Sequence, residues 1–137
     1  MLKILILCTG NSCRSQMAEG LLTHFSKNTK VYSAGTNPEK VNPLAIKVMK
    51  DIGIDISKNT SNFANEYNDI DFDYVFTVCD NAKDICPIYP KAKQMIHQSF
   101  ADPADAKGND SEQLVVYVKV RNQLSEYFKA FAKNNLS

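Results

Sequence analysis

The chain has 137 residues, of which 44% are hydrophobic and 23% are charged, a composition typical of soluble globular proteins. This length fits one domain, residues 1–137, that buries roughly two-thirds of the surface its unfolded chain exposes. Sixteen Lys and Arg against fifteen Asp and Glu leave a net charge of +1, so we expect no recruitment of nucleic acid or of a membrane surface by a global field. Any anion site must therefore be local.

The first apolar run, residues 2–7, predicts a buried strand, because it is shorter than the apolar core of a secretory leader. No stretch approaches the roughly 18 apolar residues of a membrane span. We therefore expect a cytoplasmic protein. We also expect it to be a monomer. Because thiols are mostly reduced in the cytoplasm, redox, catalytic or metal chemistry is expected of the four cysteines, Cys8, Cys13, Cys79 and Cys86.

Strand and helix patterns alternate along the rest of the chain. The spacing of apolar residues predicts helices at 15–27, 43–53 and 111–134, and strands at 30–35, 72–79 and 93–98. Ser15 is expected to cap the first helix. Strands separated by helices imply right-handed crossovers, and hence an α/β three-layer sandwich with a four-stranded parallel sheet flanked by helices. In such sheets ligands bind beyond the carboxyl ends of the strands, where Cys8 and Cys79 are both predicted to lie.

The segment that joins the first strand to the first helix has the form C-x5-R, from Cys8 to Arg14. A turn of this length can point several backbone N–H groups inward, and the helix start adds partial positive charge, which favours a tetrahedral oxyanion. We expect Gly10 to allow the tight turn and the close approach of an oxygen. The residues predicted to bind the oxyanion are Thr9, Gly10, Asn11, Ser12, Cys13, Arg14 and Ser15.

Cys8 is the candidate nucleophile of this loop. The helix start and Arg14 favour its thiolate, and Ser15 can donate its hydroxyl group to the sulfur. Arg14 offers a planar fork that can hold two oxygens and stabilise charge in the transition state. Two alternatives are a buried structural cysteine and a zinc site made by all four cysteines, whose C-x4-C and C-x6-C spacings suit zinc poorly. For Cys13, packing inside the loop is the favoured role.

The stretch "CTGNSCRSQMAEG" resembles the phosphate-binding loop and first helix of the low-molecular-weight protein tyrosine phosphatase superfamily, and more closely its thioredoxin-coupled arsenate reductase branch. The stretch "VYSAGTNPEKVNPLAIKVMKDIGIDIS" resembles the second strand and helix of that family, and "ADP", at 101–103, resembles its general-acid loop. A phosphatase needs one nucleophilic cysteine and an acid, whereas the reductases carry two more cysteines after the third strand. Here those are Cys79 and Cys86.

The resemblance implies that Cys8 attacks arsenate held by the loop and Arg14, while Asp102 protonates the leaving oxygen. Cys79 then attacks Cys8 and releases arsenite, Cys86 attacks Cys79, and the resulting disulfide is passed to thioredoxin. Phosphate and sulfate would compete with arsenate, and some phosphatase activity would remain. No cofactor is required by this scheme.

The spacing of the second cysteine pair adds a constraint. A helix over "CDNAKDIC" would separate the Cα atoms of Cys79 and Cys86 by about 10 Å, whereas a disulfide tolerates no more than ~7 Å. We therefore expect this segment to be helical in the reduced protein and to unwind when the disulfide forms.

Some reductases of this branch bind potassium behind the loop, and the matching positions here are Asn11, Glu19 and Ser33. A further acidic ligand of the family falls near Asn62, an amide that removes one negative charge from the set. Asn11 and Glu19 could instead brace the loop without a cation.

Two other functions compete with arsenate reduction. The first is a low-molecular-weight protein tyrosine phosphatase whose extra cysteines protect the nucleophile by forming a disulfide. The second is a non-enzymatic module that binds oxyanions or senses redox state, which requires Cys8 to be unreactive.

Overall fold

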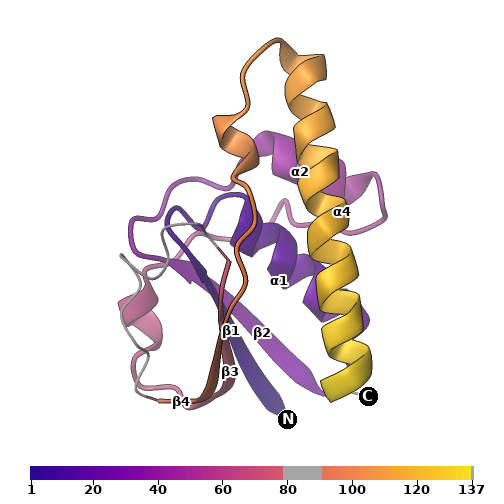
Figure 1. Ribbon diagram of the computed structural model, residues 1–137. Coiled ribbons are helices and arrows are strands. Elements are labelled where there is room, and N and C mark those ends of the chain that lie inside the picture. Colours follow the sequence, from indigo (N-terminus) through magenta and orange to yellow (C-terminus); the bar gives the residue numbers. More distant parts are fainter. Residues whose placement is uncertain (79–90, 137) are drawn as a thin grey trace.

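A computed structural model describes residues 1–78 and 91–136 of the chain (Figure 1). The elements follow in the order β1 (Leu2–Cys8), α1 (Arg14–Phe25), β2 (Thr29–Gly35), α2 (Pro43–Lys50), the 3-10 helix η1 (Ala64–Tyr67), β3 (Phe72–Thr77), β4 (Ala92–His97), the 3-10 helix η2 (Pro103–Asp105) and α4 (Asp110–Asn135). The predicted helix between Cys79 and Cys86, and the end of the strand expected to reach Cys79, lie outside the described residues.

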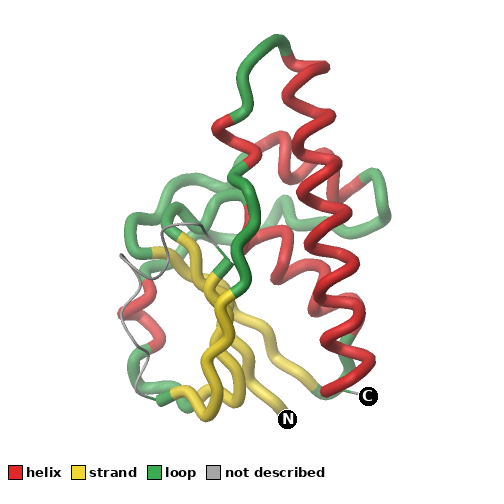
Figure 2. The backbone as a smooth tube through the Cα atoms, in the orientation of Figure 1, coloured by secondary structure: helices red, strands yellow, loops and turns green. Residues whose placement is uncertain are grey.

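The four strands form one parallel sheet in the order β2-β1-β3-β4 (Figure 2). Helices α1, α2 and α4 lie on one side of this sheet and η1 lies on the other (Figure 1). The α/β fold class and the four-stranded parallel sheet predicted from the sequence are thus confirmed. Cys8, at the end of β1, pairs with Gly35 at the end of β2, so the loop after β1 emerges at the carboxyl edge of the sheet.

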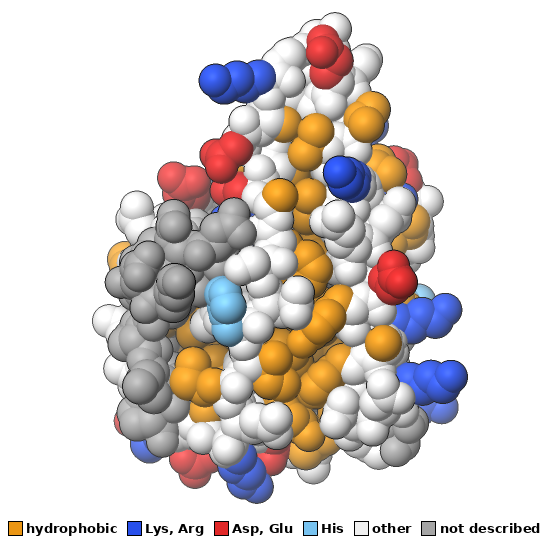
Figure 3. Space-filling view, in the orientation of Figure 1, with side chains coloured by type: hydrophobic (Ala, Val, Ile, Leu, Met, Phe, Trp, Pro, Cys, Tyr) orange, Lys and Arg blue, Asp and Glu red, His pale blue; other side chains and the backbone are white. Residues whose placement is uncertain are grey.

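Helix α4 is held to the sheet by aromatic side chains. The ring of Phe76 in β3 makes edge-to-face contacts with Phe128 and Phe131, at centroid distances of 5.2 and 4.8 Å. Such pairs add to the free energy of burying the rings. A band of hydrophobic side chains follows α4 in Figure 3, and the groove beside it is lined by Phe100 and Tyr127 among others. The segment after β4 that leads to the cavity is therefore anchored on α4.

The first half of α4 is helical although it contains four valines, Val115, Val116, Val118 and Val120. A capping box fixes its start, because the Asn109 side chain accepts from the Glu112 N–H at 2.9 Å and the Glu112 carboxylate accepts from the Asn109 N–H. This cap and the packing of the buried face offset the low helix propensity of β-branched residues. Among the described helices none is long and apolar enough to cross a bilayer.

The packing of α4 makes a stability prediction. Replacing the fully buried Phe128 with Ala should lower the free energy of unfolding by about 3–5 kcal/mol, because it leaves a cavity between α4 and the sheet. Val115→Ala, at a position 68% exposed on the same helix, should change it by no more than about 0.5 kcal/mol. Urea unfolding followed by circular dichroism measures both, and equal effects would contradict this packing.

Candidate active site

The loop between β1 and α1 is held from outside through its backbone carbonyl groups. Three of them accept hydrogen bonds from the segment after β2. The pairs are Thr9 with the N–H of Asn37 at 2.9 Å, Gly10 with that of Glu39 at 2.7 Å, and Ser12 with that of Asn42 at 3.0 Å.

Two further carbonyls of the loop are also bonded away from its centre. The Asn11 carbonyl accepts from the Gln16 side chain at 2.9 Å and from the Ser61 hydroxyl at 2.8 Å. The Cys13 carbonyl accepts the first helical hydrogen bond of α1, from Met17 at 2.9 Å. In a planar trans peptide the next N–H points opposite to the carbonyl, so outward carbonyls turn the N–H groups of 10–14 inward. The predicted oxyanion cradle is therefore present as backbone geometry.

The tight turn of the loop falls on Asn11 rather than on Gly10. Asn11 has a φ of 48°, in the left-handed region that asparagine tolerates, whereas Gly10 does not have a positive φ. The Asn11 side chain holds this conformation by accepting from the Asn62 N–H at 2.9 Å and donating to the Ser15 hydroxyl at 2.8 Å. The expectation that Gly10 makes the turn is wrong, because side-chain hydrogen bonds stabilise the strained conformation one residue later.

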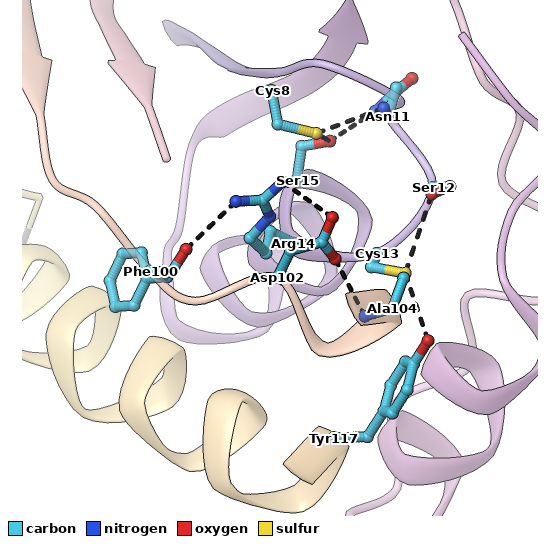
Figure 4. A network of polar contacts seen from close by, with 10 residues as sticks. All are labelled: Cys8, Asn11, Ser12, Cys13, Arg14, Ser15, Phe100, Asp102, Ala104 and Tyr117. Carbon is cyan, nitrogen blue, oxygen red and sulfur yellow. Dashed lines mark hydrogen bonds and ion pairs between the residues drawn. The ribbon is translucent and has the colours of Figure 1, made fainter. Parts of the chain in front are cut away.

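The Cys8 sulfur lies at the base of the cradle and receives two donors (Figure 4). The Asn11 N–H donates to it at 3.2 Å, and the Ser15 hydroxyl lies 2.9 Å away. Because the Ser15 oxygen already accepts from Asn11, its hydrogen is available to the sulfur. Ser15 does not cap α1 as predicted: Cys13 occupies the cap position without a side-chain hydrogen bond, and Ser15 lies inside the helix. Its hydroxyl serves the sulfur instead.

Arg14 and Asp102 meet at the opening of the cradle (Figure 4). The Arg14 guanidinium donates to the Phe100 carbonyl at 3.1 Å and to the Asp102 carboxylate at 3.2 Å. Guanidinium carries five N–H donors, so these two contacts leave others for an oxyanion. The second Asp102 oxygen accepts from the Ala104 N–H at 3.0 Å, which fixes the carboxylate at the start of η2. Asp102, the predicted acid, thus lies in contact with Arg14, the residue predicted to hold the oxyanion.

These residues surround one cavity of about 300 Å³. Its lining consists of Cys8, Thr9, Gly10, Ser12, Cys13, Arg14, Asn37, Glu39, Asp102, Ala104 and Asp105. Most of the predicted oxyanion-binding residues are therefore gathered around it, and Asn11 and Ser15 support the Cys8 sulfur from behind. A cradle of N–H groups with a sulfur at its base can bind a tetrahedral oxyanion and attack its central atom.

Cys13 packs inside the loop, on the side of α4. It is only 3% exposed, and its sulfur lies 3.7 Å from the Ser12 hydroxyl and 3.8 Å from that of Tyr117. Burial raises the pKa of the Cys13 thiol to about 11. At neutral pH this thiol is therefore protonated and a poor nucleophile.

A polar layer behind the loop contains the residues expected to bind potassium. The Glu19 carboxylate accepts from the Ser33 hydroxyl at 2.8 Å and from the Asn59 side chain at 2.7 Å. Burial raises the pKa of Glu19. Asn11 is linked to Glu19 by hydrogen bonds through the side chains of Gln16 and Asn59. Within the described ranges, no three His, Cys, Asp or Glu side chains gather as a metal cluster.

Comparison with known proteins identifies the family. Residues 3–136 match the family model described as low molecular weight phosphotyrosine protein phosphatase. The chain belongs to this family. Among its relatives, an arsenate reductase of Halalkalibacterium halodurans is 46% identical over 131 residues, which cover 95% of this chain and 94% of the relative. The resemblance drawn from the loop motif is thus confirmed.

Solved structures of arsenate reductases agree with the fold. An arsenate reductase in the phosphate-binding state superposes with a TM-score of 0.83 at 33% identity, over the full length of both chains. An arsenate reductase in the oxidized state gives a TM-score of 0.84 at 30% identity, over 98% of each chain. The fold of this chain is therefore shared with an arsenate reductase described in a phosphate-binding state.

The sequence patterns do not predict several residues that hold the loop. Asn37, Asn42 and Ser61 hold loop carbonyls, and two of these contacts use backbone atoms that leave no side-chain pattern. Gly35 gives a clearer signal, a glycine at a strand end. A Cβ placed there would lie 2.5 Å from the Thr9 carbonyl oxygen and 3.0 Å from the Asn11 nitrogen. Only glycine lets the loop close against β2.

Gly35 therefore provides a test of the cradle. Gly35→Ala should lower the free energy of unfolding by about 1–3 kcal/mol and weaken phosphate binding, because the loop must move away from β2. Gly10→Ala serves as the stability control, since its Cβ would meet no heavy atom nearer than 3.4 Å. Urea unfolding and phosphate titration by calorimetry measure the effects, and a Gly35→Ala variant as stable as Gly10→Ala would refute the close contact.

Proposed function

We propose that the protein reduces arsenate to arsenite, with Cys8 as the nucleophile. The observation that carries this proposal is the cradle of inward N–H groups around the Cys8 sulfur, closed by Arg14 and Asp102 in one cavity. A relative named arsenate reductase, at 46% identity along nearly the whole chain, favours arsenate as the oxyanion.

The first step is a substitution at arsenic. The Cys8 thiolate forms an S–As bond, and one arsenate oxygen leaves as water after Asp102 has delivered a proton to it. Arg14 and the inward N–H groups stabilise the charge on the remaining oxygens. The product is a covalent arseno-cysteine in which arsenic is still pentavalent.

The second step reduces arsenic and uses the other cysteines. The Cys79 thiolate attacks the Cys8 sulfur, so an S–S bond forms and the electron pair of the S–As bond goes to arsenic, which leaves as arsenite. The Cys86 thiolate then attacks Cys79 and frees Cys8. One observation on the described residues supports Cys79 as the thiol that attacks Cys8: Val78, directly before Cys79 in sequence, donates its N–H to the carbonyl of Leu7, directly before Cys8, at 3.0 Å.

The cycle closes when a dithiol partner reduces the Cys79–Cys86 disulfide. We infer that this partner is thioredoxin and that the protein works as a monomer in the cytoplasm, where such partners keep disulfides reduced. Two thiols are oxidised for each arsenate reduced, so the electrons balance without a bound cofactor.

Phosphatase activity is the second candidate function, and the family itself favours it. The same cradle would hold a phosphate ester, Cys8 would form a phospho-cysteine, and Asp102 would protonate the leaving alcohol. In that case Cys79 and Cys86 would only protect Cys8 by forming a disulfide with it.

Potassium binding at Glu19 and Ser33, with Asn11 nearby, belongs to the same proposal. The set consists of carboxylate, hydroxyl and amide oxygens, the donors that hard cations prefer, and a cation would offset the buried charge of Glu19. Asn62 would contribute an amide where the family has an acid. Without a cation, the same hydrogen bonds brace the loop from behind.

The relay is tested by arsenate-dependent oxidation of NADPH in the presence of thioredoxin and thioredoxin reductase. Wild-type protein should turn over many times, Cys8→Ser should be inactive, and Cys86→Ser should stop after one arsenite per protein, because its Cys8–Cys79 disulfide is not passed on. Cys13→Ser is the matched control and should keep most of the activity.

Hydrolysis of an aryl phosphate is measured in parallel. Sustained turnover by Cys86→Ser would refute the relay. Aryl phosphate hydrolysis without arsenate reduction would favour the phosphatase.

Potassium is tested through stability, since a ligand that binds only the folded state raises the melting temperature. At equal ionic strength, KCl should raise the melting temperature above that in NaCl by about 3 °C, and Glu19→Gln should remove the difference. The same melting temperature in both salts would contradict potassium binding and would show that the polar layer around Glu19 only supports the loop.

A further inference from the structure

The cavity is lined by more hydrogen-bond acceptors than an anion site needs. Its lining includes three carboxylates, those of Glu39, Asp102 and Asp105, around the single guanidinium of Arg14. Asp102 is engaged by Arg14 and by the Ala104 N–H. Within the described part of the chain, no hydrogen bond or ion pair engages the Glu39 carboxylate, although it lines the cavity. Among the described residues, the Glu39 carboxylate is therefore a hydrogen-bond acceptor without a partner at an oxyanion site.

The backbone of Glu39 is fixed to the loop. Its N–H donates to the Gly10 carbonyl at 2.7 Å, and its own carbonyl accepts from the Ser61 hydroxyl. Its carboxylate oxygen Oε2 lies 3.5 Å from the point that a Cβ on Gly10 would occupy. The carboxylate therefore lies near Gly10 on the wall of the cavity, and the outward Thr9 carbonyl turns the Gly10 N–H into the same cradle. A bound oxyanion would meet both.

We propose that Glu39 determines which oxyanion the site accepts, by taking a hydrogen bond from a protonated oxygen of the substrate. A carboxylate can only accept hydrogen bonds. Arsenate and phosphate keep a proton at neutral pH and can donate it, whereas sulfate keeps none and meets Glu39 as a like charge. Glu39 thus favours arsenate and phosphate over sulfate. This inference rests on the proposed function, because it concerns the same oxyanion cradle.

The Glu39 carboxylate also makes the site favour inorganic oxyanions over phosphate esters. A phosphate monoester that has lost both protons has no O–H group to offer, so Glu39 repels it as it repels sulfate. Inorganic phosphate and arsenate keep one O–H group at neutral pH and therefore keep the hydrogen bond to Glu39. Glu39 therefore shifts the cavity from ester hydrolysis towards arsenate, although the cradle itself would hold either.

The test is the ratio of the dissociation constants of sulfate and phosphate, measured by calorimetry at pH 7 on the full-length reduced protein. Wild type should bind phosphate more tightly than sulfate. Glu39→Gln should narrow this ratio by about tenfold, because the amide loses the repulsion and can donate to sulfate. Glu126→Gln removes the same charge from the groove beside α4, outside the cavity, and should leave the ratio unchanged.

Two outcomes overturn the proposal. The first is that wild type binds both anions equally. The second is that Glu39→Gln leaves the ratio unchanged, including the case in which both affinities change by the same factor, which shows a charge effect alone. Arsenate-dependent NADPH oxidation is followed separately. A chain that prefers phosphate through Glu39 and does not reduce arsenate would leave this inference standing and remove the proposed function.

Discussion

The outward hydrogen bonding of five consecutive carbonyls, residues 9–13, is the constraint on which the site depends. A loop with its N–H groups turned inward gathers partial positive charge at one point and would open without support. Here the support comes from the segment after β2, from Ser61 and from α1. Each hydrogen bond contributes about 1 kcal/mol net, so the set offsets several kcal/mol of electrostatic cost. The cradle is therefore formed before any substrate arrives.

The sequence predicted those parts of this arrangement that depend on side-chain patterns. The apolar run before Cys8 and the helical spacing after it place the C-x5-R loop between a strand and a helix, and the structure has it there. The donors of Asn37, Glu39 and Asn42 could not be predicted, because they are backbone N–H groups that any residue could supply. Their location depends on β2 pairing with β1 in one register, which is a tertiary property.

The two local errors have a common physical origin. Ser, Asn and Gly are the residues of helix caps and tight turns, and they are also the residues that donate to a sulfur or line a cradle. Ser15 was predicted as a cap and donates to Cys8, while Asn11 takes the left-handed turn expected of Gly10. A single sequence does not separate these roles, since the same short polar side chain can perform either. In the structure, the hydrogen bond from the Asn11 side chain to the Ser15 hydroxyl shows which role each residue has. It links the left-handed turn at Asn11 to the hydroxyl that faces the Cys8 sulfur.

The cradle alone does not distinguish a phosphatase from a reductase. Both reactions need a tetrahedral oxyanion, a thiolate below it and an acid above it, and these parts are identical up to the first covalent intermediate. The difference must therefore come from groups outside these shared parts. One is Cys79, which follows Val78 in sequence; just beyond β3 the Val78 N–H donates to the carbonyl of Leu7, directly before Cys8. Another is the carboxylate of Glu39, which lines the cavity and which we propose accepts a hydrogen bond from a protonated oxyanion. A shared cradle with different groups around it lets one fold carry both chemistries.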